Sequence, residues 1–332
     1  MAETESIARM SDILSKELFG VFGWTQVGPK NQNWQCVDDQ HNKKSHPSDV
    51  VYWYGSPYAS EEDERLYVNI DLKSYAKETI SPGKVADALR NLAKSVECAQ
   101  KSPDWQKLFV NTDFNSAVFG LLFIFNHDGE YDLDLAKSCA ALPIESIELT
   151  LGVRIALFSP TLISYLSTVA NDISRKFGED RKPGADTYQF YYPNLIRTKA
   201  QSQFWPVGTI ELLTGPWQIV RWVESTTSTP RQYFRLYYSG AGEVGDEFKY
   251  MLDYLFRYQL VDKNNQIGIR LPFASPNSAA LFETAKDQYF QYYFRSFHTN
   301  EVVQELKKTI VFEPVTRISN RFHSIEIGMQ DR

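Results

Sequence analysis

The sequence predicts an α/β protein, in which a mixed sheet flanked by helices is followed by a second domain of the α+β type. Three observations lead to this prediction. The chain of 332 residues exceeds the size that one hydrophobic core normally serves. Strand-like and helix-like patterns alternate along both halves. A polar segment rich in Gly and Pro, residues 178–186, separates the halves, so we expect domains over 1–180 and 185–332.

The first half is expected to run helix, three strands, helix, strand. These elements are expected at residues 3–19 (helix), 33–37, 49–54 and 65–72 (strands), 81–100 (helix) and 117–125 (strand). The second helix begins with Ser-Pro, a favourable N-cap and first-turn pair. The last strand lacks alternation, as a strand buried on both faces does. A strand at 152–158 and a helix at 160–177 are expected to extend the same sheet.

The second half is expected to fold as a domain of its own. Strands are indicated at 187–193, 208–213, 217–223, 232–238, 267–271 and 309–315, and helices at about 244–260 and 277–297. Gly240, Gly242 and Gly245 match a dinucleotide-binding fingerprint by letter. Acidic residues crowd the start of the following helix, where a pyrophosphate would have to bind. The pattern therefore favours a Gly-rich turn whose acids complement the helix dipole.

Composition argues against several classes of protein. A net charge of −6 is unlike that of a protein that simply coats nucleic acid, although a local basic groove stays compatible with it. Cys36, Cys98 and Cys139 are odd in number and widely spaced, which argues against a disulfide framework and a zinc site. The N-terminus carries acids where a signal peptide has bases, and the longest apolar run, 117–125, is too short to span a bilayer. We therefore expect a cytoplasmic protein with no membrane partner.

A carboxylate and a lysine occupy unusual positions in the third predicted strand. Residues 66, 68, 70 and 72 are apolar, so Asp71 and Lys73 share the opposite face, about 7 Å apart. Asp49 opens the preceding strand, and pairing of the two strands would bring its carboxylate near Asp71. Clustered carboxylates repel each other and gain most by sharing a divalent cation. Hard oxygen ligands suit Mg²⁺, with Mn²⁺ as a substitute, while Lys73 would orient or deprotonate a water.

These residues and the order of elements resemble the PD-(D/E)XK nuclease superfamily, whose fold is restriction-endonuclease-like. The resemblance covers about residues 3–126 and rests on Asp49, which follows His46-Pro47-Ser48, and on Asp71-Leu-Lys73. Ser48 intervenes where Pro is often adjacent to the Asp. Many members add an acid on the first helix, and Glu17 is in that place. The resemblance implies that Asp49, Asp71 and Glu17 bind the metal and that these three and Lys73 are catalytic.

The same resemblance implies a function and a setting. It implies a Mg²⁺-dependent nuclease that hydrolyses phosphodiester bonds in DNA, within a bacterial restriction or anti-phage defence system. The second domain, residues 185–332, would then recognise the substrate, bind a protein partner or form a homo-oligomer. The sequence does not distinguish DNA from RNA, or single from double strands.

Other interpretations of these residues stay open. Asp71 and Lys73 could be an edge-strand charge pair, Asp49 a turn residue and Glu17 a solvated helix residue. A nuclease fold can also serve as a catalytically inactive interaction subunit of a larger complex, because fold does not fix function. The aromatic stretch at 287–297 could stack on bases, form an interface or pack in a core.

Overall fold

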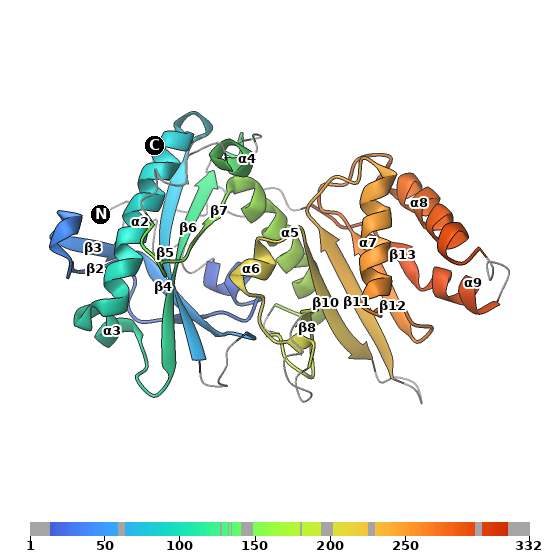
Figure 1. Cartoon of the computed structure of the whole chain (residues 1–332), viewed down its shortest axis with the longest axis horizontal. Coiled ribbons are helices and arrows are strands. Elements are labelled where there is room, and N and C mark those ends of the chain that lie inside the picture. The colour runs from blue at the N-terminus through green and yellow to red at the C-terminus, as the bar shows by residue number, and fades with distance from the viewer. Residues whose placement is uncertain are drawn as a thin grey trace. The chain divides into compact units, whose positions relative to one another are not determined.

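The computed structural model describes residues 14–58, 64–126, 128–131, 133, 135–140, 149–179, 181–193, 202–224, 230–295 and 301–317. They form two compact units, and the division falls within one helix, after Ala170. Each unit holds a mixed sheet with helices packed on it, which confirms the predicted fold class (Figure 1). The linker expected at 178–186 follows that helix. Within the described ranges, no helix has the length and apolar character needed to cross a membrane.

The first unit is built on a five-stranded sheet in the order β1-β4-β5-β6-β7. The strands are β1 (Thr25–Val27), β4 (Val50–Gly55), β5 (Glu64–Tyr75), β6 (Asn115–Asn126) and β7 (Ile155–Phe158). Pairing is antiparallel from β1 to β5 and parallel from β5 to β7. The strand predicted after residue 152 therefore does extend the same sheet.

A separate two-stranded ribbon takes the place of the first predicted strand. The strand predicted at 33–37 is found, but it does not join the main sheet. Instead β2 (Gln32–Gln35) pairs antiparallel with β3 (Ser45–Ser48), and the shorter β1 lies at the edge of the main sheet. Only Trp34 of β2 is buried, and one apolar side chain does not specify which sheet a strand joins.

Helices cover the first sheet and connect its strands. They are η1 (Leu14–Phe19), η2 (Asp39–His41), η3 (Lys77–Thr79), α2 (Pro82–Lys101), α3 (Pro103–Phe109), α4 (Leu135–Ala140) and α5 (Pro160–Phe177). Of the helix predicted at 3–19, the structure describes the last part, which forms η1. The first part of this predicted helix lies outside the described residues. The helix predicted at 81–100 is confirmed as α2, with the Ser81 side chain accepting the N–H of Lys84 at 3.4 Å.

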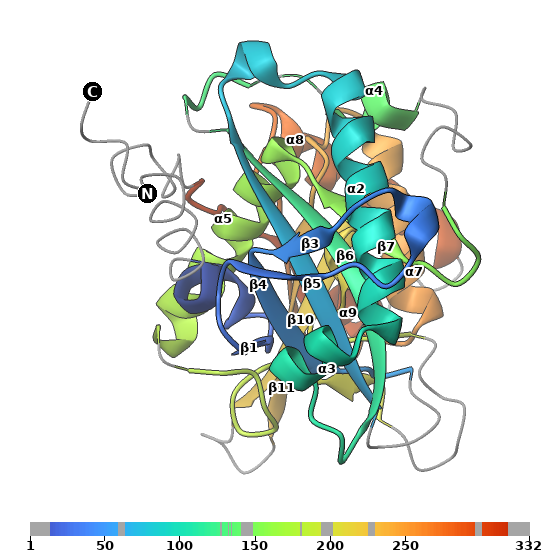
Figure 2. The same ribbon diagram turned by 90° about the vertical axis from the view of Figure 1, so that its left-hand side faces the viewer.

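The two faces of the first sheet bury different clusters. Apolar residues of α2 pack against Tyr67 of β5 and Leu122 of β6, so α2 covers that face (Figure 2). Gly120 of β6 lies on the same face, and a Cβ there would approach Val96 of α2 to 2.7 Å. On the opposite face, Phe19 of η1 stacks on Trp24 with ring centroids 4.5 Å apart. This second cluster fixes η1 to the side of the sheet away from α2.

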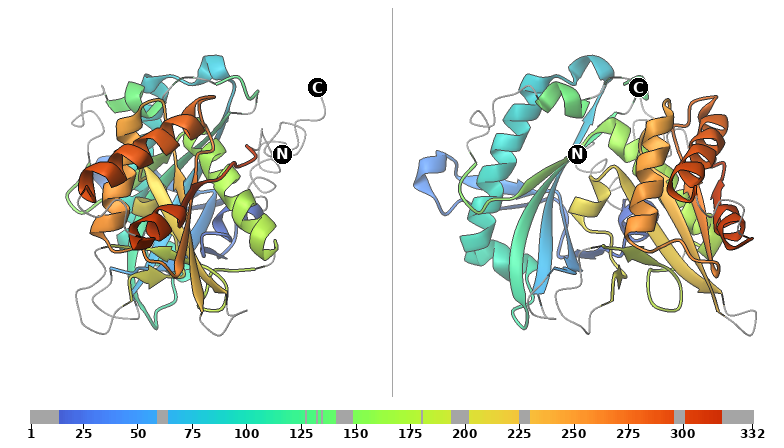
Figure 3. Two further views of the ribbon diagram at one scale, coloured as in Figure 1. Left: turned by 90° about the vertical axis from the view of Figure 1, so that its right-hand side faces the viewer. Right: turned by 45° about the vertical axis from the view of Figure 1, so that its right-hand side comes forward.

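The second unit holds a six-stranded sheet in the order β13-β12-β11-β10-β8-β9. The strands are β8 (Gln189–Tyr191), β9 (Phe204–Trp205), β10 (Trp217–Glu224), β11 (Arg231–Tyr238), β12 (Asn265–Arg270) and β13 (Ile310–Phe312). The helices are α6 (Ile210–Leu213), α7 (Gly245–Arg257), α8 (Ser278–Tyr293) and α9 (Glu301–Lys308). Apolar residues of α7 and α8 form one core with β11 and β12, so both helices lie on one face (Figure 3).

Two local predictions in the second unit have different outcomes. Residues 208–213, predicted as a strand, contain the short helix α6 instead, because the Thr209 hydroxyl accepts the N–H of Leu212 at 3.3 Å and caps it. The Gly-rich loop before α7 is a turn, as predicted. The Glu247 carboxylate accepts the N–H groups of Glu243 at 3.0 Å and Val244 at 3.1 Å. An acid of the chain thus takes the donors that a phosphate would need.

An ion-pair network ties the end of α5 to the second sheet. The Asp172 carboxylate accepts hydrogen bonds from Arg270 Nη1 at 2.6 Å, Arg235 Nη1 at 3.3 Å and the Tyr237 hydroxyl at 2.6 Å. Arg270 also pairs with Glu313 at 2.7 Å. The side chains of Asp172, Arg235 and Arg270 are 12–15% exposed, so these charges depend on one another rather than on water.

Candidate active site

Asp49 and Asp71 lie opposite each other at the start of β4 and in the second half of β5. The pairing of these strands places Val50 opposite Ile70, and the same register continued by one residue places Asp49 opposite Asp71. The Asp49 carboxylate accepts the backbone N–H of Leu72 at 2.8 Å. This bond holds the side chain against β5. The proximity of the two acids, predicted from strand pairing, is therefore found in the structure.

The side chain of Lys73 lies next to these two acids, because Lys73 and Asp71 share one face of β5. Its Nζ lies 2.7 Å from Oδ1 of Asp71. The Asp71 and Lys73 side chains are 16% and 33% exposed, whereas Asp49 is only 7% exposed. Asn69, two residues earlier on this face, donates to Ser95 of α2 at 3.1 Å. Asp71 and Lys73 thus follow the part of β5 that α2 covers, and Lys73 is the most accessible of the three charged residues.

Burial and mutual repulsion change the proton affinities of the acids. Burial, followed by the charge of Asp71, raises the pKa of Asp49 to about 7, against the opposing effects of the Leu72 N–H and Lys73. A hydrogen bond between the two carboxyl groups adds to the rise. Burial alone would lower the pKa of Lys73, but the charges of Asp71 and Asp49 outweigh it and raise that pKa. Near neutral pH, Lys73 is therefore an ammonium close to Asp49, whose carboxyl group is still partly protonated.

This donor set fits a divalent cation. Burial and then the charge of Asp71 raise the pKa of Asp49, and a cation bound by both carboxylates would offset that charge repulsion. Carboxylate oxygens are hard ligands of the kind that Mg²⁺ and Mn²⁺ prefer. The bond from Leu72 orients the Asp49 carboxylate before any ion binds. Asp49 and Asp71 therefore have the chemistry and the position that a ligand role requires.

Glu17, the third predicted acid, is placed by η1. Its neighbours Leu18 and Phe19 are fully buried, and Phe19 packs on Tyr52 and Phe123 with ring centroids 4.9 and 6.3 Å apart. These rings belong to the sheet face away from α2, whereas Asp71 belongs to the face that α2 covers. A ligand role for Glu17 stays a prediction.

Ser48, which sequence reasoning left without a role, anchors the strand that leads into the site. Its hydroxyl oxygen accepts the indole N–H of Trp34 at 3.0 Å and that of Trp105 at 3.2 Å. Ser48 is 1% exposed, so both bonds are shielded from water. They join the residue before Asp49 to β2 and α3. In the sequence, Ser48 is recognisable as a polar residue next to a predicted ligand. That position does not reveal Trp34 and Trp105 as its partners, because they are 14 and 57 positions away.

Lys43 and Lys44 precede β3 and are both exposed. Lys43 Nζ donates to Asn91 of α2 at 2.7 Å. This bond holds the loop that carries both lysines on the α2 side of the sheet.

Comparison with known protein families finds a model that matches most of this first unit. A family model described as the GAPS4 protein PD-(D/E)XK nuclease domain matches residues 1–161. The match spans all five strands of the first sheet and includes Asp49, Asp71, Lys73 and Glu17. The resemblance drawn from these residues is thereby confirmed. Searches of curated proteins and of solved structures found no match.

Proposed function

We propose that this chain, whose first 161 residues match the GAPS4 PD-(D/E)XK nuclease domain, is a metal-dependent nuclease that hydrolyses phosphodiester bonds in DNA. The observation that carries the proposal is the convergence of Asp49, Asp71 and Lys73. Asp49 lies opposite Asp71, and Lys73 Nζ contacts Asp71 at 2.7 Å. An inactive interaction subunit would need none of these three charges to meet at partly buried positions, where each costs free energy.

Asp49 and Asp71 are the proposed ligands of Mg²⁺, for which Mn²⁺ would substitute, with Glu17 as a further proposed ligand. When bound, such an ion stabilises charge on a phosphoryl oxygen and makes a bound water more acidic. Leu72 fixes the Asp49 carboxylate through its N–H, and Asp71 holds Lys73 through their ion pair. These contacts keep the reacting groups in place before the substrate arrives, which lowers the entropic cost of reaction.

Lys73 has a defined role in this proposal. The raised pKa of its ammonium makes it a poor general base near neutral pH. It remains a strong hydrogen-bond donor and a positive charge. We therefore assign to Lys73 the positioning of the attacking water and the compensation of negative charge that builds on the phosphate.

The biological setting proposed is anti-phage defence in bacteria, in line with the GAPS4 family. The second unit lies outside the matched residues. We propose that it recognises the substrate, binds a protein partner or forms a homo-oligomer.

The test is cleavage of plasmid DNA, single-stranded DNA and RNA with Mg²⁺ or Mn²⁺. Wild type is compared with Lys73→Ala and with Lys84→Ala, which removes an exposed lysine from the first turn of α2. We expect metal-dependent cleavage of DNA by wild type and Lys84→Ala, and none by Lys73→Ala. Full activity of Lys73→Ala would overturn the site, and cleavage of RNA alone would overturn the choice of substrate.

A further inference from the structure

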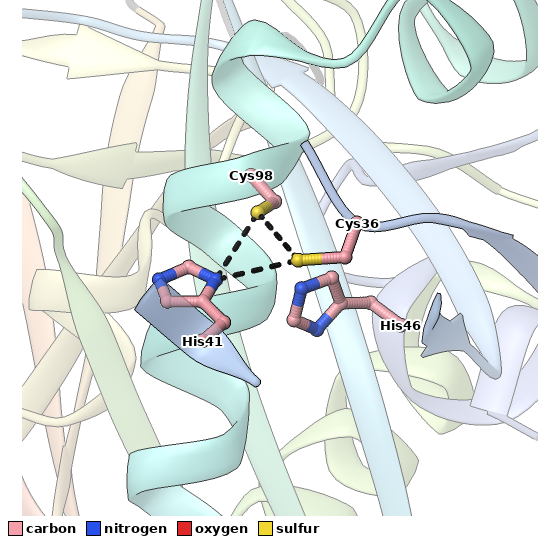
Figure 4. A group of neighbouring side chains, drawn as sticks. All are labelled: Cys36, His41, His46 and Cys98. Carbon is pink, nitrogen blue, oxygen red and sulfur yellow. Dashed lines mark hydrogen bonds between the residues drawn. The ribbon is translucent and has the colours of Figure 1, made fainter. Parts of the chain in front are cut away.

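Four side chains from separate elements meet between the β2–β3 ribbon and α2 (Figure 4). Cys36 follows β2, His41 ends η2, His46 lies in β3, and Cys98 lies near the end of α2. We propose that these four residues bind a structural zinc ion. The number and spacing of the cysteines argue against a zinc site, but Cys36 and Cys98 meet in space although 62 positions separate them.

The distances between the ligand atoms fit a tetrahedral ion. Cys36 Sγ lies 3.6 Å from Cys98 Sγ and 3.7 Å from His41 Nδ1, while Cys98 Sγ lies 3.2 Å from that nitrogen. Zinc with its usual bond lengths to sulfur and nitrogen needs separations of about 3.3–3.8 Å between neighbouring ligand atoms. One ligand atom from each of the four residues lies within 4.8 Å of the others. Small rotations of the side chains would therefore complete the tetrahedron.

His46 gives a second, independent reason to expect a ligand. It is fully buried, and neither nitrogen of its imidazole has a hydrogen-bond partner in the described part of the chain. Trp34 packs on its ring with centroids 5.1 Å apart. A buried imidazole without partners costs free energy that a metal–nitrogen bond would offset.

The surroundings of His41 match those of a zinc-bound histidine. Its Nδ1 faces the two sulfurs, and its Nε2 lies 3.5 Å from Oε2 of Glu97. That oxygen also accepts a hydrogen bond from the Thr150 hydroxyl at 2.9 Å, so the carboxylate is itself held in place. A carboxylate on the outer nitrogen fixes the tautomer and orientation of a metal-ligating histidine.

The donor set determines the class of ion and its role. Two thiolates and two imidazoles in tetrahedral geometry select zinc over hard cations such as Mg²⁺. Four protein ligands fill the coordination sphere, so the ion would be structural rather than catalytic. An isolated two-stranded ribbon is marginally stable in water. The ion would link the β2–β3 ribbon to α2. One of its ligands, His46, lies three residues before Asp49 in the chain.

Metal analysis of the wild-type chain, purified without chelators, tests this proposal and does not depend on nuclease activity. We expect about one zinc per chain. Titration with a mercurial should release this zinc as two thiols react. Cys36→Ser and Cys98→Ser should lose the zinc and unfold at lower temperature. Cys139→Ser is the matched control, because this third cysteine is free and outside the cluster, and it should keep the zinc.

Three results would overturn the proposal. They are a zinc-free wild type that also fails to take up added Zn²⁺, a Cys98→Ser variant that retains the metal, and a Cys36–Cys98 disulfide found by mass spectrometry of the purified chain. If the serine variants do not fold, Co²⁺ bound to wild type decides the question. Tetrahedral ligand-field bands with thiolate charge-transfer bands support the site, and their absence contradicts it.

Discussion

Asp49 lies opposite Asp71 across the β4–β5 pair, and its carboxylate accepts the N–H of Leu72, the residue after Asp71, at 2.8 Å. The register of β4 and β5 therefore brings the two acids together. Lys73 is the next residue of β5 on the same face. The arrangement is costly without a counter-charge, since each acid raises the energy of the other. The same cost makes it a favourable place for a divalent cation.

The raised pKa of Asp49 predicts how the stability of the fold depends on pH when no divalent cation is added. The pKa of Asp49 is raised in the folded protein to about 7 from its ordinary 3.8. The stabilisation linked to the Asp49 proton is fully present below pH 3.8 and is lost as the pH rises through about 7. The pKa of Asp49 rises by about three units, which sets an upper limit of about 4 kcal/mol on the free energy of unfolding that is lost.

Urea unfolding at pH 5 and pH 8 measures this effect. Wild type should lose more unfolding free energy between these pH values than Asp49→Asn, which cannot ionise at this position. The variant corrects for all other groups that titrate over the range. An equal loss in the two proteins would show that Asp49 ionises normally.

Ser48→Ala should destabilise the first unit without changing the charges of the site. The substitution leaves the indole N–H groups of Trp34 and Trp105 buried without their acceptor. Each such loss costs about 1–3 kcal/mol, so we expect about 2–6 kcal/mol in total. Denaturant unfolding of Ser48→Ala beside Ser45→Ala, an exposed serine of the same strand, provides the measurement. Equal stability of the two variants would contradict the anchoring role.

Asp172→Asn should destabilise the second unit. The change removes the charge that Arg235 and Arg270 share in a region where all three side chains are largely buried. Removing one partner of a buried ion pair costs about 3–5 kcal/mol. We expect a cost near the lower value, because Arg270 keeps its ion pair with Glu313. Asp246→Asn serves as the control in thermal unfolding, since that side chain is 87% exposed. A midpoint for Asp172→Asn equal to that of the control would refute the prediction.

The sequence predicts those features that short-range patterns determine. Alternation along β5 is enough to place Asp71 and Lys73 on one face, and Ser81-Pro82 marks the start of α2. The pairing of β2 and the cluster around His46 depend instead on contacts between distant elements. Cys98 reaches His41 because α2 packs across the sheet, and no spacing rule encodes a separation of 57 positions. The partners of Ser48 are missed for the same reason.

The proposed active site is tested most directly by the rate at which Asp71→Asn cleaves plasmid DNA with Mg²⁺. This substitution keeps the size of the side chain and removes its charge. Glu305→Gln makes a comparable change at an exposed acid of α9, which is also followed two residues later by a lysine, Lys307. We expect Asp71→Asn to stay folded and to lose at least about 100-fold in rate, while Glu305→Gln cleaves like wild type. Cleavage by Asp71→Asn at the wild-type rate would contradict the assignment of Asp49, Asp71 and Lys73 as the active site.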